Sequence, residues 1–448
     1  MEKLFSEFKS ATAQDWKNQI IKDLKGTDFE KLIWKNPNGF DVNPFYTSED
    51  LQHQAPDLFT HSNWEICSEF LVEDEKKTNA EALKALMGGA SSLVFIVDKK
   101  INIGLLLQDI LIEHIEVNFV LKHVDESFIA DFKLYAKQKN IHADKINGSV
   151  CFDAISHFAE TGNEIKAEFK QEDSSLKAIG VNASLYQNAG ATQAFELACT
   201  MAHAHEYVVS LANKNSSYKN PFYFTVAIGS DFFGEIAKLR ALRKLWSLLA
   251  QEYNINQEIH IHCETSLLNK SSLDANNNML RTTTEGMSAV IGGCNSLTIH
   301  PHNTGFENQT DFSERMARNQ QLILKEESYL HHTADMGAGS YYIEKLTDEL
   351  AGKAWDEFKE IENKGGFIAC LKSNFIQEKI KQQADNLIQQ FQTGELVLVG
   401  VNKFQAKDVS EKNQDVRSST QGKKINLNSK ISLLKSITLS DYLVKQHA

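Results

Sequence analysis

The sequence lacks a basic stripe, closely spaced cysteines and long apolar runs. Its formal net charge is −12 at pH 7, so we expect neither nucleic acid nor an anionic membrane surface as a partner. Six cysteines without a C-x-x-C pair argue against a zinc ribbon or a disulfide framework and suit a reducing compartment. The N-terminus has no apolar signal core, and no stretch of about 18 apolar residues could span a membrane. We therefore expect a cytoplasmic protein.

Standard catalytic and metal-binding motifs are missing as well. The sequence contains no H-E-x-x-H, no G-x-S-x-G, no G-x-x-x-x-G-K-[ST] and no G-x-G-x-x-G after a strand. His203 and His205 are two positions apart on a predicted helix and cannot share a face. His260 and His262 share a strand face, but such pairs more often form hydrogen bonds in a core than bind a metal. Residues 335–340 are interpreted as a tight turn before a strand-like YYIE, rather than as an anion-binding loop.

The residues that are present alternate between strand and helix patterns from residue 64 onward. Helical patterns such as 79–87, 128–139, 190–213, 231–252, 276–291 and 311–327 separate or follow the strands. Eight such units over roughly 250 residues match a (βα)8 TIM barrel better than an open doubly wound sheet. The eight predicted strands are Trp64–Val72, Ser92–Asp98, Ile115–Lys122, Gly148–Asp153, Leu176–Ser184, Phe222–Gly229, Glu258–Thr265 and Ser296–His300.

The barrel interior is predicted to be partly polar. On the strand Glu258–Thr265, His260, His262 and Glu264 alternate with apolar residues and should point inward. Either a channel follows the axis or these groups hydrogen-bond inside a filled core, and the usual packing of barrels favours the filled core. We expect bulky strand residues to fill it, and the candidates are Phe119, Phe152 and Phe224.

The barrel, residues 63–395 with its following helices, is predicted to lie between an arm and a tail. Residues 1–62 carry Trp16 and Trp34 in an extended segment that is too short for its own core. This arm should lie on the barrel or on another subunit, and we favour the other subunit. The tail, residues 396–448, includes a polar stretch from Val409 to Lys424 that predicts partial disorder.

Six sequence blocks follow one another along the chain. They are YTSEDL at 46–51, FFGEIAKLRALRKLW at 232–246, HCETS at 262–266, NNNMLRTTTEGMSAVIGG at 276–293, ARN at 317–319 and GSYYIEKLT at 339–347. These blocks resemble the acyl-CoA mutases that use adenosylcobalamin, above all the methylmalonyl-CoA mutase family, and the resemblance extends from the arm to about Lys403. It implies a TIM barrel threaded by the pantetheine of coenzyme A, with a separate domain that holds cobalamin through D-x-H-x-x-G.

The departures from this family pattern concern its functional residues. Leu185 stands where the family has the His that binds the thioester carbonyl, and leucine cannot donate a hydrogen bond. Ser184 replaces the family's Tyr, and Glu264 replaces its Gln. No D-x-H-x-x-G occurs, and the chain stops at Ala448, which is too early for a cobalamin domain. The first strand carries acidic residues, in EICSEFLVEDEKKTNA, where the family binds coenzyme A phosphates.

Four further residues keep family-like positions and complete the candidate site: Gln187, Lys238, His262 and Arg281. Each of them can also be structural, and we expect Arg281 to pair with Glu285 along its helix. The resemblance therefore implies a non-catalytic small subunit that binds no cofactor itself. Its partner would be a larger catalytic homologue carrying adenosylcobalamin. The alternatives are a catalytic chain whose cobalamin domain is a separate polypeptide, and a non-enzymatic barrel that binds an acyl-CoA.

Overall fold

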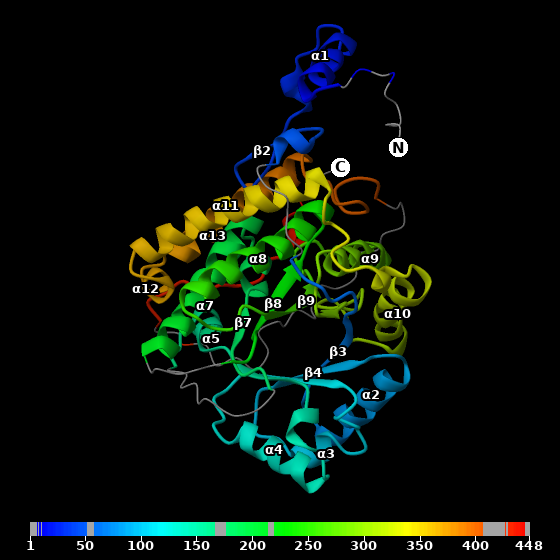
Figure 1. The fold of residues 1–448 in the computed structure, drawn as a ribbon. Coiled ribbons are helices and arrows are strands. Elements are labelled where there is room, and N and C mark those ends of the chain that lie inside the picture. The colour runs from blue at the N-terminus through cyan, green and yellow to red at the C-terminus, as the bar shows by residue number, and fades with distance from the viewer. Residues whose placement is uncertain are drawn as a thin grey trace.

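The computed structural model shows a barrel with helices around it and an N-terminal arm that projects from one side (Figure 1). It describes residues 7, 9, 11–51, 58–165, 176–213, 219–405, 426 and 429–443. The stretch 409–424, for which the sequence predicts disorder, lies outside these residues. Within them, no helix has the length and apolar character needed to cross a membrane.

Eight parallel strands form the (βα)8 barrel that the sequence predicts. They follow the order β6-β5-β4-β3-β10-β9-β8-β7, and a parallel bridge between Ser149 and Lys177 joins β6 to the segment before β7. The strands are β3 Glu65–Leu71, β4 Ser92–Val97, β5 Glu116–Leu121, β6 Gly148–Phe152, β7 Gly180–Asn182, β8 Phe222–Ile228, β9 Ile259–Thr265 and β10 Ser296–Thr298. Of the eight strands, β7 is the one that is much shorter than predicted. Before it, Lys177 forms only an isolated bridge to Ser149, and after it Ser184 already begins a helix.

Helices follow the strands and cover the outside of the barrel (Figure 1). The barrel helices are α2 Glu75–Met87, α3 Ile103–Leu106, α4 Phe128–Gln138, α5 Ala154–Thr161, α6 Ser184–Asn188, α7 Gln193–Asn213, α8 Phe232–Glu252, α9 Ala275–Ile291 and α10 Asp311–Leu322, which a π-helical turn at Ile323–Glu327 extends. Three more, α11 Tyr341–Asn363, α12 Phe367–Lys372 and α13 Phe375–Thr393, pack outside them.

The apolar side chains form two main clusters between strands and helices. One surrounds β4 to β6 and includes Phe95, Phe119 and Phe132. The other, larger cluster lies between β7 to β10 and the helices α7, α8 and α11. Trp246 of α8, for example, packs on Phe222 of β8 with ring centroids 4.6 Å apart. Burying these outer faces leaves the alternate strand residues to face the barrel axis.

The segment YYIE is helical, so its interpretation as a strand was wrong. Tyr341 begins α11, and Glu344 in the first turn pairs with the buried Arg240 and accepts a hydrogen bond from the Gly339 amide at 3.0 Å. A carboxylate near a helix N-terminus stabilises the helix. Here this interaction outweighs the preference of the YYIE segment for a strand. The turn before it is present, with the Ala338 amide donating to the Asp335 carbonyl.

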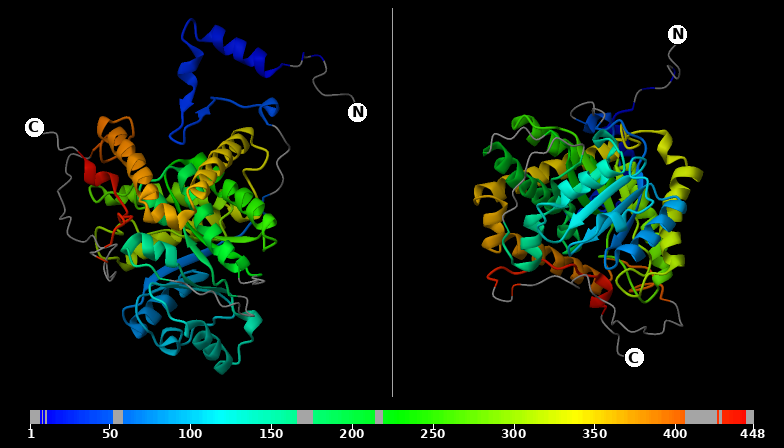
Figure 2. Two further views of the ribbon diagram at one scale, coloured as in Figure 1. Left: turned by 90° about the vertical axis from the view of Figure 1, so that its left-hand side faces the viewer. Right: turned by 90° about the horizontal axis from the view of Figure 1, so that it is seen from below.

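The arm contains α1 Ala13–Asp23 and a hairpin of β1 Trp34–Lys35 and β2 Asp41–Val42. No residue of α1 is buried, and Figures 1 and 2 show α1 projecting away from the barrel. Among the described residues, the aromatic rings that Trp16 contacts are those of Phe29 and Phe45, both in the arm. The hairpin turn anchors the arm, because the Asn38 side chain accepts a hydrogen bond from the Ala194 amide at the start of α7.

Candidate functional site

The middle of the barrel is filled by polar side chains. His260 of β9 lies 3.8 Å from Glu116 of β5, and these two strands are diametrically opposite in the closed order of eight. Lys177, beside β7, binds the same Glu116 carboxylate at 2.9 Å. All three side chains are buried. Side chains therefore meet across the axis at this level.

Aromatic rings complete this filling. Tyr223 of β8 stacks on His260 and His262, with ring centroids 4.8 and 5.8 Å apart. His262 Nδ1 lies 2.9 Å from the hydroxyl of Ser296, and its Nε2 lies 3.3 Å from that of Thr298. Burial lowers the pKa of His262 to about 3 and that of His260 well below its ordinary value. Both imidazoles are thus neutral members of a hydrogen-bonded core.

The sequence correctly predicts a filled interior but selects the wrong residues to fill it. Phe119 packs edge-to-face on Phe132 of α4, and Phe224 packs on Trp246 of α8. Phe152 likewise contacts a helix residue, His157 of α5. These rings face the helices because apolar strand residues are buried in the outer clusters. The size of these side chains alone does not show toward which face of its strand each one points.

The mouth of the barrel, at the C-terminal ends of the strands, is less tightly buried. Glu69 of β3, Glu264 of β9 and His300 after β10 all keep partial solvent exposure. His300 Nε2 lies 3.9 Å from the Glu264 carboxylate. Burial and repulsion from Glu264 raise the pKa of Glu69. The mouth thus carries two carboxylates, Glu264 where the resemblance would place a glutamine and Glu69 in the strand where it would place residues that bind coenzyme A phosphates.

Three of the predicted site residues lie together on α6, directly after β7. The Ser184 hydroxyl donates to the Asn182 side chain at 2.7 Å. The Gln187 side-chain oxygen accepts from Ser266 at 2.9 Å, which ties α6 to the loop after β9. Leu185 is 5% exposed and belongs to the larger apolar cluster. A leucine buried among apolar neighbours can neither donate nor accept a hydrogen bond.

Lys238 lies apart from the mouth, between α7 and α8. Its ammonium binds Glu196 at 2.8 Å, Glu235 at 2.6 Å and the Ala227 carbonyl at 2.7 Å. Burial opposes the lysine's charge, but the two carboxylates outweigh it and raise the pKa of Lys238. Burial raises the pKa of Glu196 to about 8. With no exposed atom, Lys238 stabilises the packing of two helices.

Arg281 does not pair with Glu285, so that prediction was wrong. Its guanidinium donates to the Asn278 side chain at 2.7 Å and to the Val399 carbonyl at 2.5 Å. Lys270, from the loop after β9, binds the Glu285 carboxylate at 2.8 Å in a buried ion pair. The spacing of four positions along the helix permits a pair between Arg281 and Glu285. Only the tertiary fold shows that Lys270 binds Glu285 instead.

A buried network that positions α6 escaped the sequence reasoning. Asp153 accepts a hydrogen bond from the Asn182 amide at 2.8 Å and lies 3.0 Å from His203 Nε2. The other nitrogen of His203 lies 2.8 Å from the hydroxyl of Tyr186 on α6. His203 is fully buried, so it has a packing role and not a surface role. No pattern in the sequence indicates that these residues meet.

Outside the barrel mouth, the described residues offer little for a cofactor. No group of three or more His, Cys, Asp or Glu among them is arranged to hold a metal ion. Burial raises the pKa of Cys67, which lies 3.9 Å from His262, so this pair is no thiolate site. At the mouth, the position that carries the donor to the thioester carbonyl in the family pattern is the buried Leu185.

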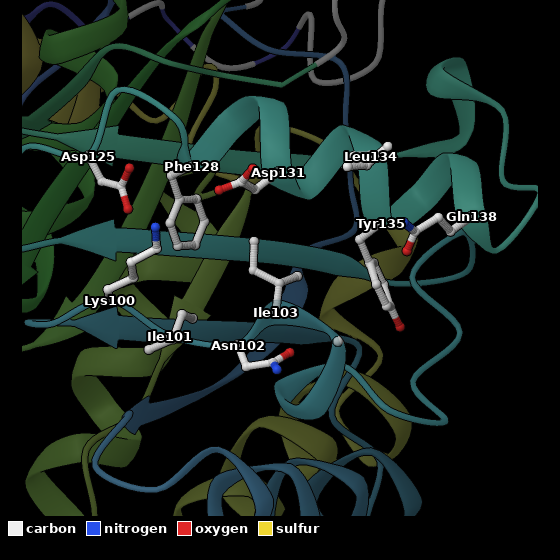
Figure 3. Close-up of a pocket in the computed structure, with 11 residues that line it drawn as sticks. Lys100, Ile101, Asn102, Ile103, Asp125, Phe128, Asp131, Leu134, Tyr135 and Gln138 are labelled. Carbon is white, nitrogen blue, oxygen red and sulfur yellow. The ribbon is translucent and has the colours of Figure 1, made fainter.

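A pocket of about 360 Å³ lies away from all these residues, between α3 and α4 (Figure 3). Lys100, Asp125 and Asp131 line it together with Tyr135. Its Tyr135 hydroxyl already donates to the Leu107 carbonyl at 2.8 Å, and Asp125 accepts from Ser127. The pocket therefore has no part in the candidate site.

The chain is similar in sequence to several known proteins. A family model described as methylmalonyl-CoA mutase matches residues 95–436. The methylmalonyl-CoA mutase small subunit of Porphyromonas gingivalis is 35% identical over 442 residues, which cover 90% of this chain and 71% of that protein. A methylmalonyl-CoA mutase of Rhizobium meliloti is 29% identical, with coverages of 88% and 64%. The small subunit of Streptomyces virginiae is 30% identical, with coverages of 84% and 68%. The chain thus spans about two thirds of the length of these relatives.

Proposed function

The chain belongs to the methylmalonyl-CoA mutase family, which confirms the resemblance in its sequence blocks, and from this premise we propose that it is the small, non-catalytic subunit of a heterodimeric mutase. Two of its relatives carry the name small subunit. A protein named large subunit, from Streptomyces virginiae, is 25% identical to the same chain. These names support a pair of homologous subunits.

One observation carries the non-catalytic part of the proposal, namely the contact between His260 and Glu116 across the barrel axis. In the family pattern, the pantetheine of coenzyme A threads this axis. Here a 2.9 Å ion pair between Lys177 and Glu116 holds the obstructing carboxylate in place. Displacing it would leave buried charges without partners, at a cost of several kcal/mol. The isolated chain should therefore not accept an acyl-CoA.

Leu185 supports the same conclusion from the chemistry of the reaction. Rearranging an acyl thioester requires a donor that polarises its carbonyl, and such donors typically contribute about two to four orders of magnitude in rate. Leu185 is apolar and packed in the core. Adenosylcobalamin would supply the radical when bound, and we place it in the larger partner, which interconverts methylmalonyl-CoA and succinyl-CoA.

The arm is the proposed contact with that partner. Trp34 and Phe45 are 44% and 48% exposed, and Ile21 of α1 is 47% exposed. Large permanent interfaces favour aromatic side chains and bury about 2,000 Å² or more. The six cysteines are unpaired and buried, which supports a cytoplasmic location for the complex.

Removing residues 1–28, which end before the hairpin anchor at Asn38, tests this proposal. We expect the truncated chain to keep its circular dichroism spectrum and to lose co-purification with the larger subunit from the native host. The double substitution Trp16→Ala and Phe45→Ala should weaken association at least ten-fold. Retained nanomolar association of both variants would contradict the arm's role. Turnover by this chain together with a small cobalamin-binding protein would instead support the split-enzyme alternative.

A further inference from the structure

The C-terminal segment of the chain lies on the C-terminal face of the barrel, the face where TIM barrels carry their active sites. Residues 429–443 return to the barrel after α13 and lie beside this helix (Figure 2). Three backbone amides of the segment donate hydrogen bonds to carbonyls in three different connections that follow strands. These are Leu434 to Ala159 at 2.9 Å, Ile437 to Asn188 at 2.8 Å and Leu439 to Leu268 at 2.8 Å.

A few apolar side chains fasten the segment. Ile431, Leu434 and Leu439 are 8%, 6% and 3% exposed, while the intervening Lys435 is exposed. Leu439 packs with Leu268 in a small third cluster. The segment has no regular secondary structure except a single turn at Leu439–Tyr442. Segments with so few buried contacts open below the free energy of global unfolding.

Two of the carbonyls that receive the segment, those of Asn188 and Leu268, belong to α6 and to the loop after β9, which carry or adjoin the candidate site. Asn188 ends α6, and its side chain accepts from the Leu267 amide at 3.0 Å and from Ser266 at 3.2 Å. Ser266 in turn donates to Gln187 at 2.9 Å. The segment therefore closes over the junction of α6 with the loop after β9.

We infer that residues 429–443 form a displaceable strap that holds this junction closed and keeps a second protein domain from reaching Gln187 and Ser266. The inference rests on the proposed function, in which this barrel needs no approach from a cofactor-bearing domain. The strap occupies the surface with its own backbone and its own leucines, so a competing domain must first release it. Its release should be a local event, because α13 keeps contacts to the barrel that do not involve the strap, such as the hydrogen bond from the Thr192 amide to the Gln383 side chain at 2.9 Å.

Thiol labelling of the full-length chain tests the strap. All six native cysteines are buried, so a cysteine introduced as Leu268→Cys beneath the strap gives a separate signal with a maleimide. We expect it to react more slowly than a small-molecule thiol but faster than the native cysteines. Adding Leu434→Asp and Leu439→Asp should accelerate its labelling by about ten-fold or more, because buried carboxylates disfavour docking. Lys435→Asp is the matched control and should leave the rate unchanged.

Two outcomes would overturn the inference. Labelling of Leu268→Cys at the rate of the native cysteines would mean that the strap leaves only on global unfolding. Fast labelling that the leucine substitutions do not change would mean that the strap does not cover the junction. Hydrogen exchange at the amides of Leu434, Ile437 and Leu439 in the unsubstituted chain gives the same distinction without mutation. Neither measurement involves the larger subunit, so failure here leaves the proposed heterodimer untouched.

Discussion

At the residue scale, Lys238 shows how a family-like position can be structural. Replacing it with methionine would leave Glu196 and Glu235 buried without their cation. Removing one member of a buried ion pair costs about 3–5 kcal/mol, and we expect a loss in this range from denaturant unfolding of Lys238→Met. The matched control is Lys244→Met on the same helix. Its 2.6 Å pair with Asp348 is about half exposed, so it should cost less than about 1 kcal/mol. Equal losses of stability for the two variants would contradict the structural role of Lys238.

His262 provides a test of pH dependence. Burial lowers its pKa in the folded chain to about 3 from an ordinary value of 6.5. Its contribution to stability is therefore present above pH 6.5 and is lost as pH falls toward 3. At pH 4.5 the loss should be roughly 2–3 kcal/mol relative to pH 7. His262→Gln should remove that part of the pH dependence, measured as the difference between unfolding free energies at the two pH values.

The control for His262 is the exposed His142, which lies beside Asp144 on the surface. His142→Gln should keep the pH dependence of the unsubstituted chain. If His262→Gln loses as much stability between pH 7 and pH 4.5 as the unsubstituted chain does, the imidazole is not the buried neutral group that the structure indicates.

Leu185 tests whether a missing donor alone would account for the proposed lack of catalysis. Leu185→His places a polar ring in the apolar cluster, which should cost about 1–3 kcal/mol of stability. It should produce no isomerisation of methylmalonyl-CoA, because His260 and Glu116 still meet across the axis. Leu185→Met is a control of similar volume and should cost less than about 1.5 kcal/mol. Measurable turnover by the histidine variant would show that the filled interior does not exclude the substrate.

At the scale of elements, the turn between α6 and α7 depends on Gly190. Its φ is +101°, and a Cβ there would lie 2.6 Å from the Cβ of Ala384 on α13. Gly190→Ala should therefore destabilise the chain by about 1–3 kcal/mol, visible as a lower thermal midpoint. Gly352→Ala, within α11, meets nothing within 4 Å and should stabilise by about 0.5–1 kcal/mol. An unchanged thermal midpoint for Gly190→Ala would mean that α6 and α13 can separate at little cost in free energy.

Periodicity predicted the elements well where local and tertiary preferences agree. The seventh strand and the helix that begins beside Asn276 appear within one or two residues of the predicted positions. The YYIE segment failed because Glu344 finds the buried Arg240, a partner 104 positions away in sequence. No local pattern reports such a contact. The shortened β7 has a similar cause, since its first residues reach β6 only through Lys177.

At the scale of the whole molecule, the barrel was predictable and the arrangement of its site was not. Eight alternating units suffice to indicate the fold, in which Gln187 follows β7 and Glu264 lies near the end of β9. The sequence could not show that Glu116, Lys177 and His260 come from three sides of the barrel to meet. It also could not show that Lys238 lies away from the mouth or that Arg281 binds the Val399 carbonyl, since both lie in blocks that resemble the family.

The measurement that tests the central claim most directly is a titration of isomerase activity. The larger homologous subunit from the native host, with adenosylcobalamin and methylmalonyl-CoA, is mixed with increasing amounts of this chain, and the chain is also assayed alone. We predict no turnover by the chain alone, a complex of one chain with one large subunit by native mass spectrometry, and activity that saturates at that ratio. Turnover by the chain alone, or no association with the large subunit at micromolar concentration, would contradict the account.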